Sequence, residues 1–195
     1  MSSGSTGTTG NTFADHFASH QQVVRQSVVE LHDVATAVER VLIDALQKGN
    51  KILSFGNGGS ATQASHLAGE LIGRFLKNRR PLPAIALVSD PGSVTCIAND
   101  FGYAALFERQ VEGLARPGDV AIGLTTSGRS ENVKRGLDAA RRAGAIAVAL
   151  TGAAGLIEGK ADYVVAVPSA ETASIQEVHL MLLHAWCQGI DKVFA

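Results

Sequence analysis

Residues 51–61 read Lys-Ile-Leu-Ser-Phe-Gly-Asn-Gly-Gly-Ser-Ala, an apolar run that ends in a glycine-rich turn. The run has the length of a buried strand, and a helical pattern follows the turn. Runs of the same kind recur later, with helical patterns between them, at residues 84–88, 120–124, 145–150 and 163–167. Five buried strands interleaved with helices predict an α/β fold whose parallel sheet is covered on both faces, with ligands bound beyond the carboxyl ends of the strands.

The residues before the first strand divide into two parts. Residues 1–12 are mostly Ser, Gly and Thr without apolar periodicity, which predicts a disordered N-terminal segment. Residues 13–48 carry apolar side chains near helical spacing and are closed by Gly49, which predicts one long amphipathic helix or two. Such a helix at the edge of a small domain usually packs on a further surface, and a second subunit is the simplest candidate. We therefore expect residues 13–195 to form a single domain that oligomerises.

The composition excludes several classes of protein. With 46% hydrophobic residues, 18% charged residues and a net charge of -1, the chain matches neither a disordered protein nor one that binds nucleic acid through bulk charge. Its two cysteines, Cys96 and Cys187, form no Cys-x-x-Cys pair, so neither a disulfide framework nor a thiolate zinc site is expected. No apolar stretch approaches the roughly 20 residues that span a bilayer, and no signal-peptide pattern is present. These features predict a cytoplasmic globular protein.

Two of the strand ends carry residues that suit an anion. Residues 56–61 follow the first strand and are rich in glycine, and residues 125–132 follow the third strand and are rich in hydroxyls. Glycines allow close backbone approach, and helix N-terminal amides together with hydroxyls suit a phosphate monoester. The same residue types also occur in ordinary strand-to-helix loops. Neither turn matches the nucleotide loop or the dinucleotide fingerprint, so a smaller phosphorylated ligand is favoured.

Two helical segments carry candidate metal ligands. His66 and Glu70 are four residues apart and project from one helix face, although such a pair is more often an ordinary surface pair. Gln176 and His184 lie eight residues apart, about 80° around a helix axis, and share a broad face. That face also contains Leu180, so the alternative is a core-facing helix whose polar side chains are satisfied by hydrogen bonds. We interpret Glu177 and His179 as bystanders.

Five motifs, in this order and spacing, resemble the phosphoheptose isomerase family of sugar isomerase (SIS) domains over residues 13–195. They are Gly56-Asn57-Gly58-Gly59-Ser60, Ser65-His66-Leu67-Ala68-Gly69-Glu70-Leu71, Ala98-Asn99-Asp100-Phe101-Gly102-Tyr103, Thr126-Ser127-Gly128-Arg129-Ser130-Glu131-Asn132, and Ile175-Gln176-Glu177-Val178-His179 with His184. The resemblance implies a three-layer flavodoxin-like sandwich with a five-stranded parallel sheet. It also implies a homotetramer with active sites at the subunit interfaces.

The resemblance assigns roles to individual residues. It implies one Zn²⁺ per subunit, held by His66, Glu70, Gln176 and His184, with Glu70 and His184 also catalytic. Ala173 departs from the pattern, because some relatives have an acidic residue there. The substrate-binding residues that it implies are Asn57, Gly58, Gly59, Ser60, Glu70, Asn99, Asp100, Thr125, Thr126, Ser127, Ser130 and Gln176.

The activity that the resemblance implies is conversion of D-sedoheptulose 7-phosphate to D-glycero-D-manno-heptose 7-phosphate. Moving a carbonyl between two carbons passes through an enediol, and it needs a base, an acid and an electrophile. This reaction is the first step towards nucleotide-activated heptose precursors. Three alternatives stay open: a non-enzymatic relative that binds a replication-initiation protein, a sugar-phosphate-sensing domain, and an isomerase for a pentose or amino-sugar phosphate. The first is disfavoured because such regulators do not keep the acid and the imidazole at the positions of Glu70 and His184.

Overall fold

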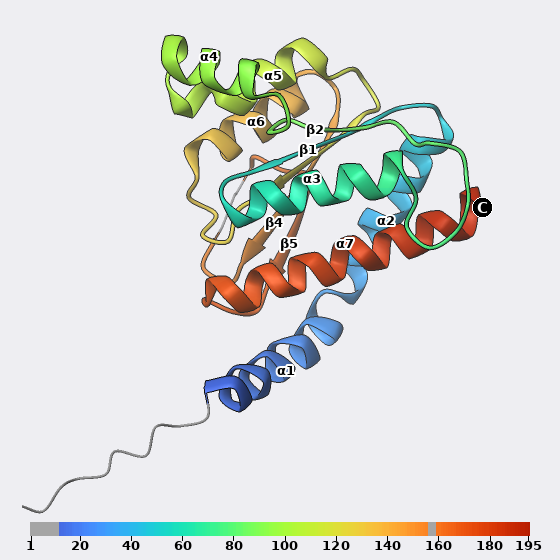
Figure 1. Ribbon diagram of the computed structural model, residues 1–195, viewed down its shortest axis with the longest axis vertical. Coiled ribbons are helices and arrows are strands. Elements are labelled where there is room, and N and C mark those ends of the chain that lie inside the picture. Colours follow the sequence, from blue (N-terminus) through green and yellow to red (C-terminus); the bar gives the residue numbers. More distant parts are fainter. Residues whose placement is uncertain (1–11, 156–158) are drawn as a thin grey trace, which may run out of the picture.

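The computed structural model describes residues 12–155 and 159–195. Its centre is an all-parallel sheet in the order β2-β1-β3-β4-β5 (Figure 1). This is the strand order of flavodoxin-like folds. From β1 the sheet is extended first on one side by β2 and then on the other side by β3, so the strand order reverses between β1 and β3. The predicted α/β class and the five-stranded parallel sheet are confirmed. The strands are β1 (Ile52–Gly56), β2 (Ala84–Ala86), β3 (Val120–Leu124), β4 (Ile146–Gly152) and β5 (Tyr163–Val167).

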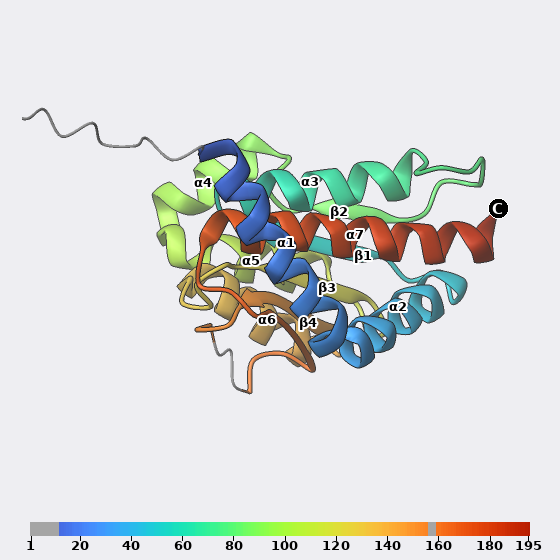
Figure 2. The same ribbon diagram turned by 90° about the horizontal axis from the view of Figure 1, so that it is seen from below.

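Helices cover both faces of the sheet and make the fold three-layered (Figures 1 and 2). Side chains of α2 (His32–Gln47), α3 (Gly59–Ile72) and α7 (Thr172–Phe194) share one apolar core with the sheet. Side chains of α4 (Pro91–Phe101), α5 (Leu106–Leu114) and α6 (Glu131–Arg142) share the core on the opposite face. A short 3₁₀ turn, η1 (Tyr103–Ala105), joins α4 to α5. Because both faces are covered, β1 and β3 are buried along their whole length.

The element boundaries differ little from those predicted. The third and fifth strands match the sequence pattern, the second is two residues shorter, and the fourth extends to Gly152. The long amphipathic stretch forms two helices, α1 (Thr12–Glu30) and α2, which meet at the buried Leu31. The segment predicted to be disordered lies outside the described residues except for Thr12, where α1 begins.

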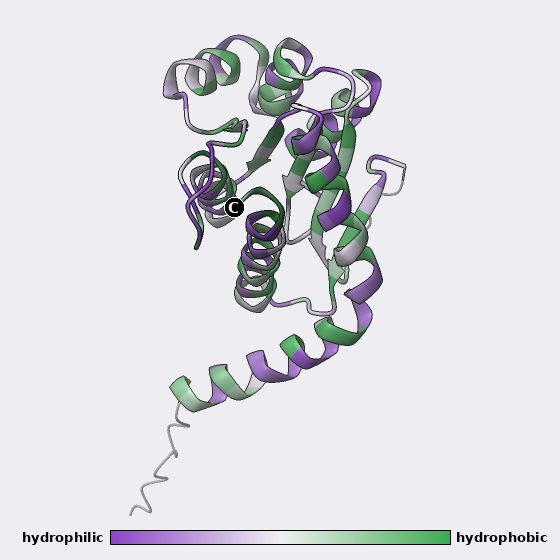
Figure 3. Cartoon of the chain, turned by 90° about the vertical axis from the view of Figure 1, so that its right-hand side faces the viewer, coloured by the Kyte–Doolittle hydropathy of each residue, from purple (hydrophilic) through white to green (hydrophobic). Residues whose placement is uncertain are grey.

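Helix α1 projects from the body of the domain and crosses α7 (Figures 2 and 3). Val23 and Leu31 pack against the core, whereas Phe13, Phe17, Val28 and Val29 are exposed. Within residues 12–155 and 159–195, no helix is both long and apolar enough to cross a bilayer.

His179 joins α7 to the sheet from inside the core. Its side chain is fully buried, and its Nε2 atom lies 3.2 Å from the Thr151 carbonyl oxygen at the end of β4. Burial lowers the pKa of His179 to about 4, although the Thr151 contact opposes that shift. The histidine that the sequence indicated as a bystander is therefore a neutral core residue that holds α7 against β4.

The neutral His179 predicts a pH-dependent stability. The folded-state pKa lies below the unfolded value of 6.5, so the unfolded chain binds the extra proton and stability falls as the pH drops from about 6.5 to 4. The expected loss from this group is about 3 kcal/mol by pH 4. Urea denaturation at pH 7 and pH 4 should show a smaller pH dependence for His179→Gln than for the wild type. A His179→Gln variant with the same pH dependence as the wild type would contradict the assignment.

Candidate active site

Three candidate metal ligands converge between α3 and α7. The Nε2 atoms of His66 and His184 lie 2.9 Å apart, and His66 Nε2 lies 3.2 Å from Glu70 Oε1. One ligand atom from each of the three residues lies within 4.8 Å of the other two. The side chains of His66 and Glu70 are 40% and 22% exposed, so the cluster is open to solvent in a single chain. His66 and Glu70, four residues apart on α3, therefore both lie close to His184 of α7.

The packing of α3 explains this placement. Its apolar side chains Ala64, Leu67, Ala68 and Leu71 are buried in the core that α3 shares with the sheet and α7. His66 and Glu70 lie at helical spacing between these positions, on the side of α3 that meets α7 at His184.

The cluster suits a divalent transition metal. Two imidazole nitrogens and a carboxylate oxygen form a donor set typical of Zn²⁺ sites, and in the described part of the chain this is the one group of that kind. Cys187, one turn after His184, does not add a ligand. Burial, followed by the nearby Glu70 charge, raises the pKa of Cys187 to about 12, so its thiol stays protonated.

Gln176 lies about two helical turns before His184 on α7, beside the first turn of α3. Its side-chain amide packs against Gly59, where a Cβ atom would come within 2.7 Å of Gln176 Nε2. Gln63 Nε2 donates to the Gln176 backbone oxygen at 2.6 Å, which fixes this part of α7 against α3. The neighbouring Glu177 belongs to a different contact, because its two carboxylate oxygens lie 2.8 Å from His16 and His20 of α1.

The two ligand turns predicted from the sequence lie side by side at the carboxyl ends of β1 and β3. Asn57 Nδ2 donates to Asn132 Oδ1 at 2.9 Å, and Asn132 Nδ2 donates to Asn57 Oδ1 at 2.8 Å. Tyr103 donates its hydroxyl to the same Asn57 oxygen at 2.8 Å. This network links the first turn, the helix after the second turn, and the segment after α4. Ser60, predicted at the helix start, is buried in the first turn of α3, and Gly58 takes the cap position with φ 55°.

The second turn forms a compact hydroxyl-lined loop. Thr125 Oγ1 and Ser130 Oγ lie 3.1 Å apart, and the Arg129 amide donates to Ser127 Oγ at 3.2 Å. The backbone closes at Gly128, whose φ of 66° is readily adopted only by glycine. Thr126 accepts a hydrogen bond from Gly152 N, so the end of β4 supports the loop from behind. The loop therefore has the rigidity that an anion site requires.

Asn99 and Asp100 lie exposed at the end of α4. Asn99 Nδ2 donates to Asp100 Oδ1 at 2.7 Å, so the two side chains form one polar group. Tyr103, three residues beyond Asp100, donates its hydroxyl to Asn57, which ties this segment to the first turn.

Sequence reasoning gave no role to three residues that touch the predicted site residues. Asn132 and Tyr103 both contact Asn57. They belong to the quoted motifs, and their position in the sequence close to candidate ligand residues could have indicated a role for them. Phe75 stacks on His184 with ring centroids 5.2 Å apart, and nothing in its local sequence indicates that contact.

Comparison with known proteins places this geometry in a family. The model of the SIS domain family matches residues 15–152. A phosphoheptose isomerase from Aquifex aeolicus (strain VF5) is 51% identical over 87% of this chain and 90% of that protein. The chain belongs to the phosphoheptose isomerase family. It is therefore an enzyme of the aldose–ketose isomerase class.

Solved structures of phosphoheptose isomerases share the fold along nearly the whole chain. One from Francisella tularensis has a TM-score of 0.89 at 32% identity and covers 92% of this chain and 96% of its own. One from Neisseria gonorrhoeae has a TM-score of 0.85 at 36% identity and covers 92% and 97%.

Gly155 supports the hydroxyl-lined loop and offers a test of it. A Cβ atom at Gly155 would lie 2.7 Å from Gly128 N, so Gly155→Ala must displace the loop backbone. We expect KM for the sugar phosphate to rise about tenfold or more, with a smaller change in kcat, because hydrogen bonds to a charged group contribute about 1.5–3 kcal/mol each. Steady-state kinetics measure this effect. Gly113→Ala, where the added methyl meets open space, is the matched control, and a KM within twofold of wild type for Gly155→Ala would refute the role of the loop.

Proposed function

We propose that this protein converts D-sedoheptulose 7-phosphate to D-glycero-D-manno-heptose 7-phosphate. The observation that carries the proposal is the arrangement along α3, which starts at the glycine-rich turn and carries His66 and Glu70 at its far end. His66 lies about 10 Å along the helix axis from Gly59, at 1.5 Å per residue. The phosphate end and the carbonyl end of one extended sugar phosphate can thus be held at the same time.

We further propose that His66, Glu70, Gln176 and His184 hold a Zn²⁺ ion. The convergence of three of the four donors supports this ligand set, and the position of Gln176 where α7 packs against α3 supports the fourth. A bound zinc ion would act as a Lewis acid that polarises the sugar oxygens.

The protein's own groups supply the proton transfers. We assign Glu70 as the base that takes the proton from the carbon next to the carbonyl and returns it to the neighbouring carbon. His184 moves protons between the two oxygens of the enediol. The ring of Phe75 covers one face of His184 and restricts its orientation, so the imidazole is aimed at the substrate before it binds.

The remaining predicted residues are assigned to the substrate. The phosphate is held by the amides and hydroxyls of the two turns, which include Ser60 and Thr125, and Asn99 and Asp100 contact sugar hydroxyls. Ala173 lies exposed in the first turn of α7 and brings no acid to this edge of the crevice. We propose that the product enters the synthesis of nucleotide-activated heptose precursors in the cytoplasm, a compartment that suits the two free cysteines. The phosphate-binding set is Asn57, Gly58, Gly59, Ser60, Thr125, Thr126, Ser127 and Ser130.

The proposed reaction predicts metal-dependent turnover. Purified protein incubated with sedoheptulose 7-phosphate should form the aldose phosphate, followed by NMR, and a chelator should abolish the reaction. Glu70→Gln and His184→Ala should each lower kcat by about 10²–10⁴-fold, the range for removal of an acid or base. Glu112→Gln, on the exposed surface of α5, is the matched control. A folded, zinc-loaded protein that gives no product would reject the heptose reaction and favour another sugar phosphate or a regulatory role.

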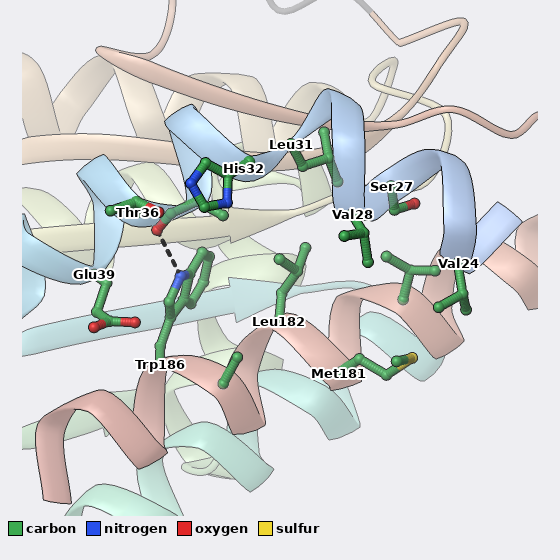
Figure 4. Close-up of a pocket in the computed structure, with 13 residues that line it drawn as sticks. Val24, Ser27, Val28, Leu31, His32, Thr36, Glu39, Met181, Leu182 and Trp186 are labelled. Carbon is green, nitrogen blue, oxygen red and sulfur yellow. Dashed lines mark hydrogen bonds between the residues drawn. The ribbon is translucent and has the colours of Figure 1, made fainter. Parts of the chain in front are cut away.

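We also propose that the protein is a homotetramer with active sites at its subunit interfaces. A groove of about 320 Å³ runs between the α1–α2 segment and α7 (Figure 4). Its floor includes Trp186, whose indole N–H donates to the Ala35 carbonyl oxygen at 3.0 Å. Val28 and Met181 line the groove and are 67% and 48% exposed. Its apolar lining and the projecting α1 favour a second copy of this chain as occupant.

Light scattering tests the assembly. The wild type should have four times the chain mass of 20.3 kDa. Met181→Glu should lower the mass, because it buries a charge without a partner in the proposed interface. Leu114→Glu changes an exposed apolar residue on α5, on the other face of the sheet, and serves as the control. A monomeric wild type would contradict both the tetramer and the shared site.

A further inference from the structure

A buried ion pair lies directly behind the proposed metal cluster. Arg79 Nε donates to Asp191 Oδ1 at 2.9 Å, and the two side chains are 0% and 3% exposed. Arg79 belongs to the loop between α3 and β2, and Asp191 lies near the end of α7. The pair therefore joins the two helices that carry the candidate ligands, and none of the hydrogen bonds that it makes within the described residues ends on a ligand side chain.

Arg79 holds the end of α3. Its Nη2 donates to the Glu70 carbonyl oxygen at 2.7 Å, and its Nη1 donates to the Leu71 carbonyl oxygen at 2.8 Å. These carbonyls belong to the last turn of the helix, where acceptors lack partners within the helix and a cation is favoured. The Arg79 guanidinium thereby fixes the backbone of Glu70, whose side chain supplies the carboxylate of the cluster.

Asp191 holds the loop that follows α3. Its Oδ2 accepts hydrogen bonds from Leu76 N at 2.8 Å and Lys77 N at 3.0 Å. Burial opposes the charge of Asp191, but these two amides and the Arg79 guanidinium lower the pKa of its carboxyl group below the ordinary value. The amide next to Phe75 is thus fixed, and Phe75 is the residue whose ring stacks on His184.

The pair is also on the same side of α7 as the cluster. His184, Cys187 and Asp191 follow one another at spacings of three and four residues, so they form one stripe on the helix. Cys187 lies between His184 and Asp191 on this stripe, and the charges of Glu70, Arg79 and Asp191 all act on the pKa of its thiol.

We propose that Arg79 and Asp191 are positioning residues that set the distance between Glu70 and His184. Replacing a buried ion pair by apolar residues often leaves stability unchanged, so stability alone gives little reason for one here. Its hydrogen bonds instead connect the Glu70 backbone and the Phe75 loop to one point on α7. The inference rests on the proposed function, because it takes Glu70 and His184 as the groups that bind metal and move protons.

A second buried carboxylate provides a matched control. Asp119 accepts hydrogen bonds from Lys51 N and Arg116 N and pairs with Lys51 Nζ, so it makes the same kinds of contact as Asp191. It is 2% exposed, but it lies before β3, at the end of the sheet opposite the ligand turns. Asp119→Asn should therefore destabilise the protein to a similar extent without altering the site.

The test compares zinc affinity, kinetics and thermal stability in the full-length protein. In Asp191→Asn we expect zinc affinity, measured by competition with a chromogenic chelator, to fall about tenfold, the lower end of the effect of losing a group bonded directly to a ligand, because Asp191 acts on the ligands only through Arg79 and the loop that carries Phe75. We expect kcat to fall by a similar factor with little change in KM, and Arg79→Lys to retain part of the activity. Asp119→Asn should keep wild-type zinc affinity and kcat. Equal zinc affinity and kcat in wild type and folded Asp191→Asn would overturn the inference.

A double replacement keeps the test decisive if Asp191→Asn does not fold. Arg79→Met with Asp191→Leu removes both charges and should fold, because no uncompensated charge is left buried. Reduced zinc affinity in this folded variant supports the positioning role, and unchanged affinity overturns it. A wild type that binds zinc but does not isomerise the heptose phosphate would reject the proposed function, while the zinc affinities still decide the role of the ion pair.

Discussion

The site depends on the packing of α3 against α7. Helix α3 begins at the glycine-rich turn after β1 and carries His66 and Glu70 in its second half. Helix α7 lies beside it and brings Gln176 next to Gly59 and His184 next to His66. Because both helices share one apolar core, the glycine-rich turn and the His66–Glu70–His184 cluster keep a fixed separation.

The sheet brings the turns after β1 and β3 next to each other. β1 and β3 are neighbours in register, with Gly56 opposite Leu124, so the turns that follow them are adjacent. The chain then leaves towards opposite faces, α3 on one and α6 on the other. The paired carboxamides of Asn57 and Asn132 join the two turns.

Hydrogen bonds add to the apolar packing that holds α7 in place. Three connections between α7 and its neighbours are hydrogen bonds: His179 to the end of β4, Gln63 to the Gln176 backbone, and the Arg79–Asp191 pair. The hydrophobic effect has no preferred direction, whereas a hydrogen bond fixes the direction and distance between two particular groups. Hydrogen bonds therefore suit a site in which a carboxylate and an imidazole have to be aligned.

The sequence by itself determined the α/β class, the five strands and the two polar turns after β1 and β3, and the resemblance of its motifs to a family singled out the residues of the His66–Glu70–His184 cluster. Strand length and helical spacing are local properties, and the motifs lie within single segments, so both can be read along the chain. Only the tertiary structure decided that Phe75 covers His184, that Tyr103 reaches Asn57, and that Arg79 and Asp191 meet behind the cluster. These partners are far apart in the sequence or lie in irregular segments, and nothing periodic connects them. Their proximity follows from how α3, α7 and the sheet pack together.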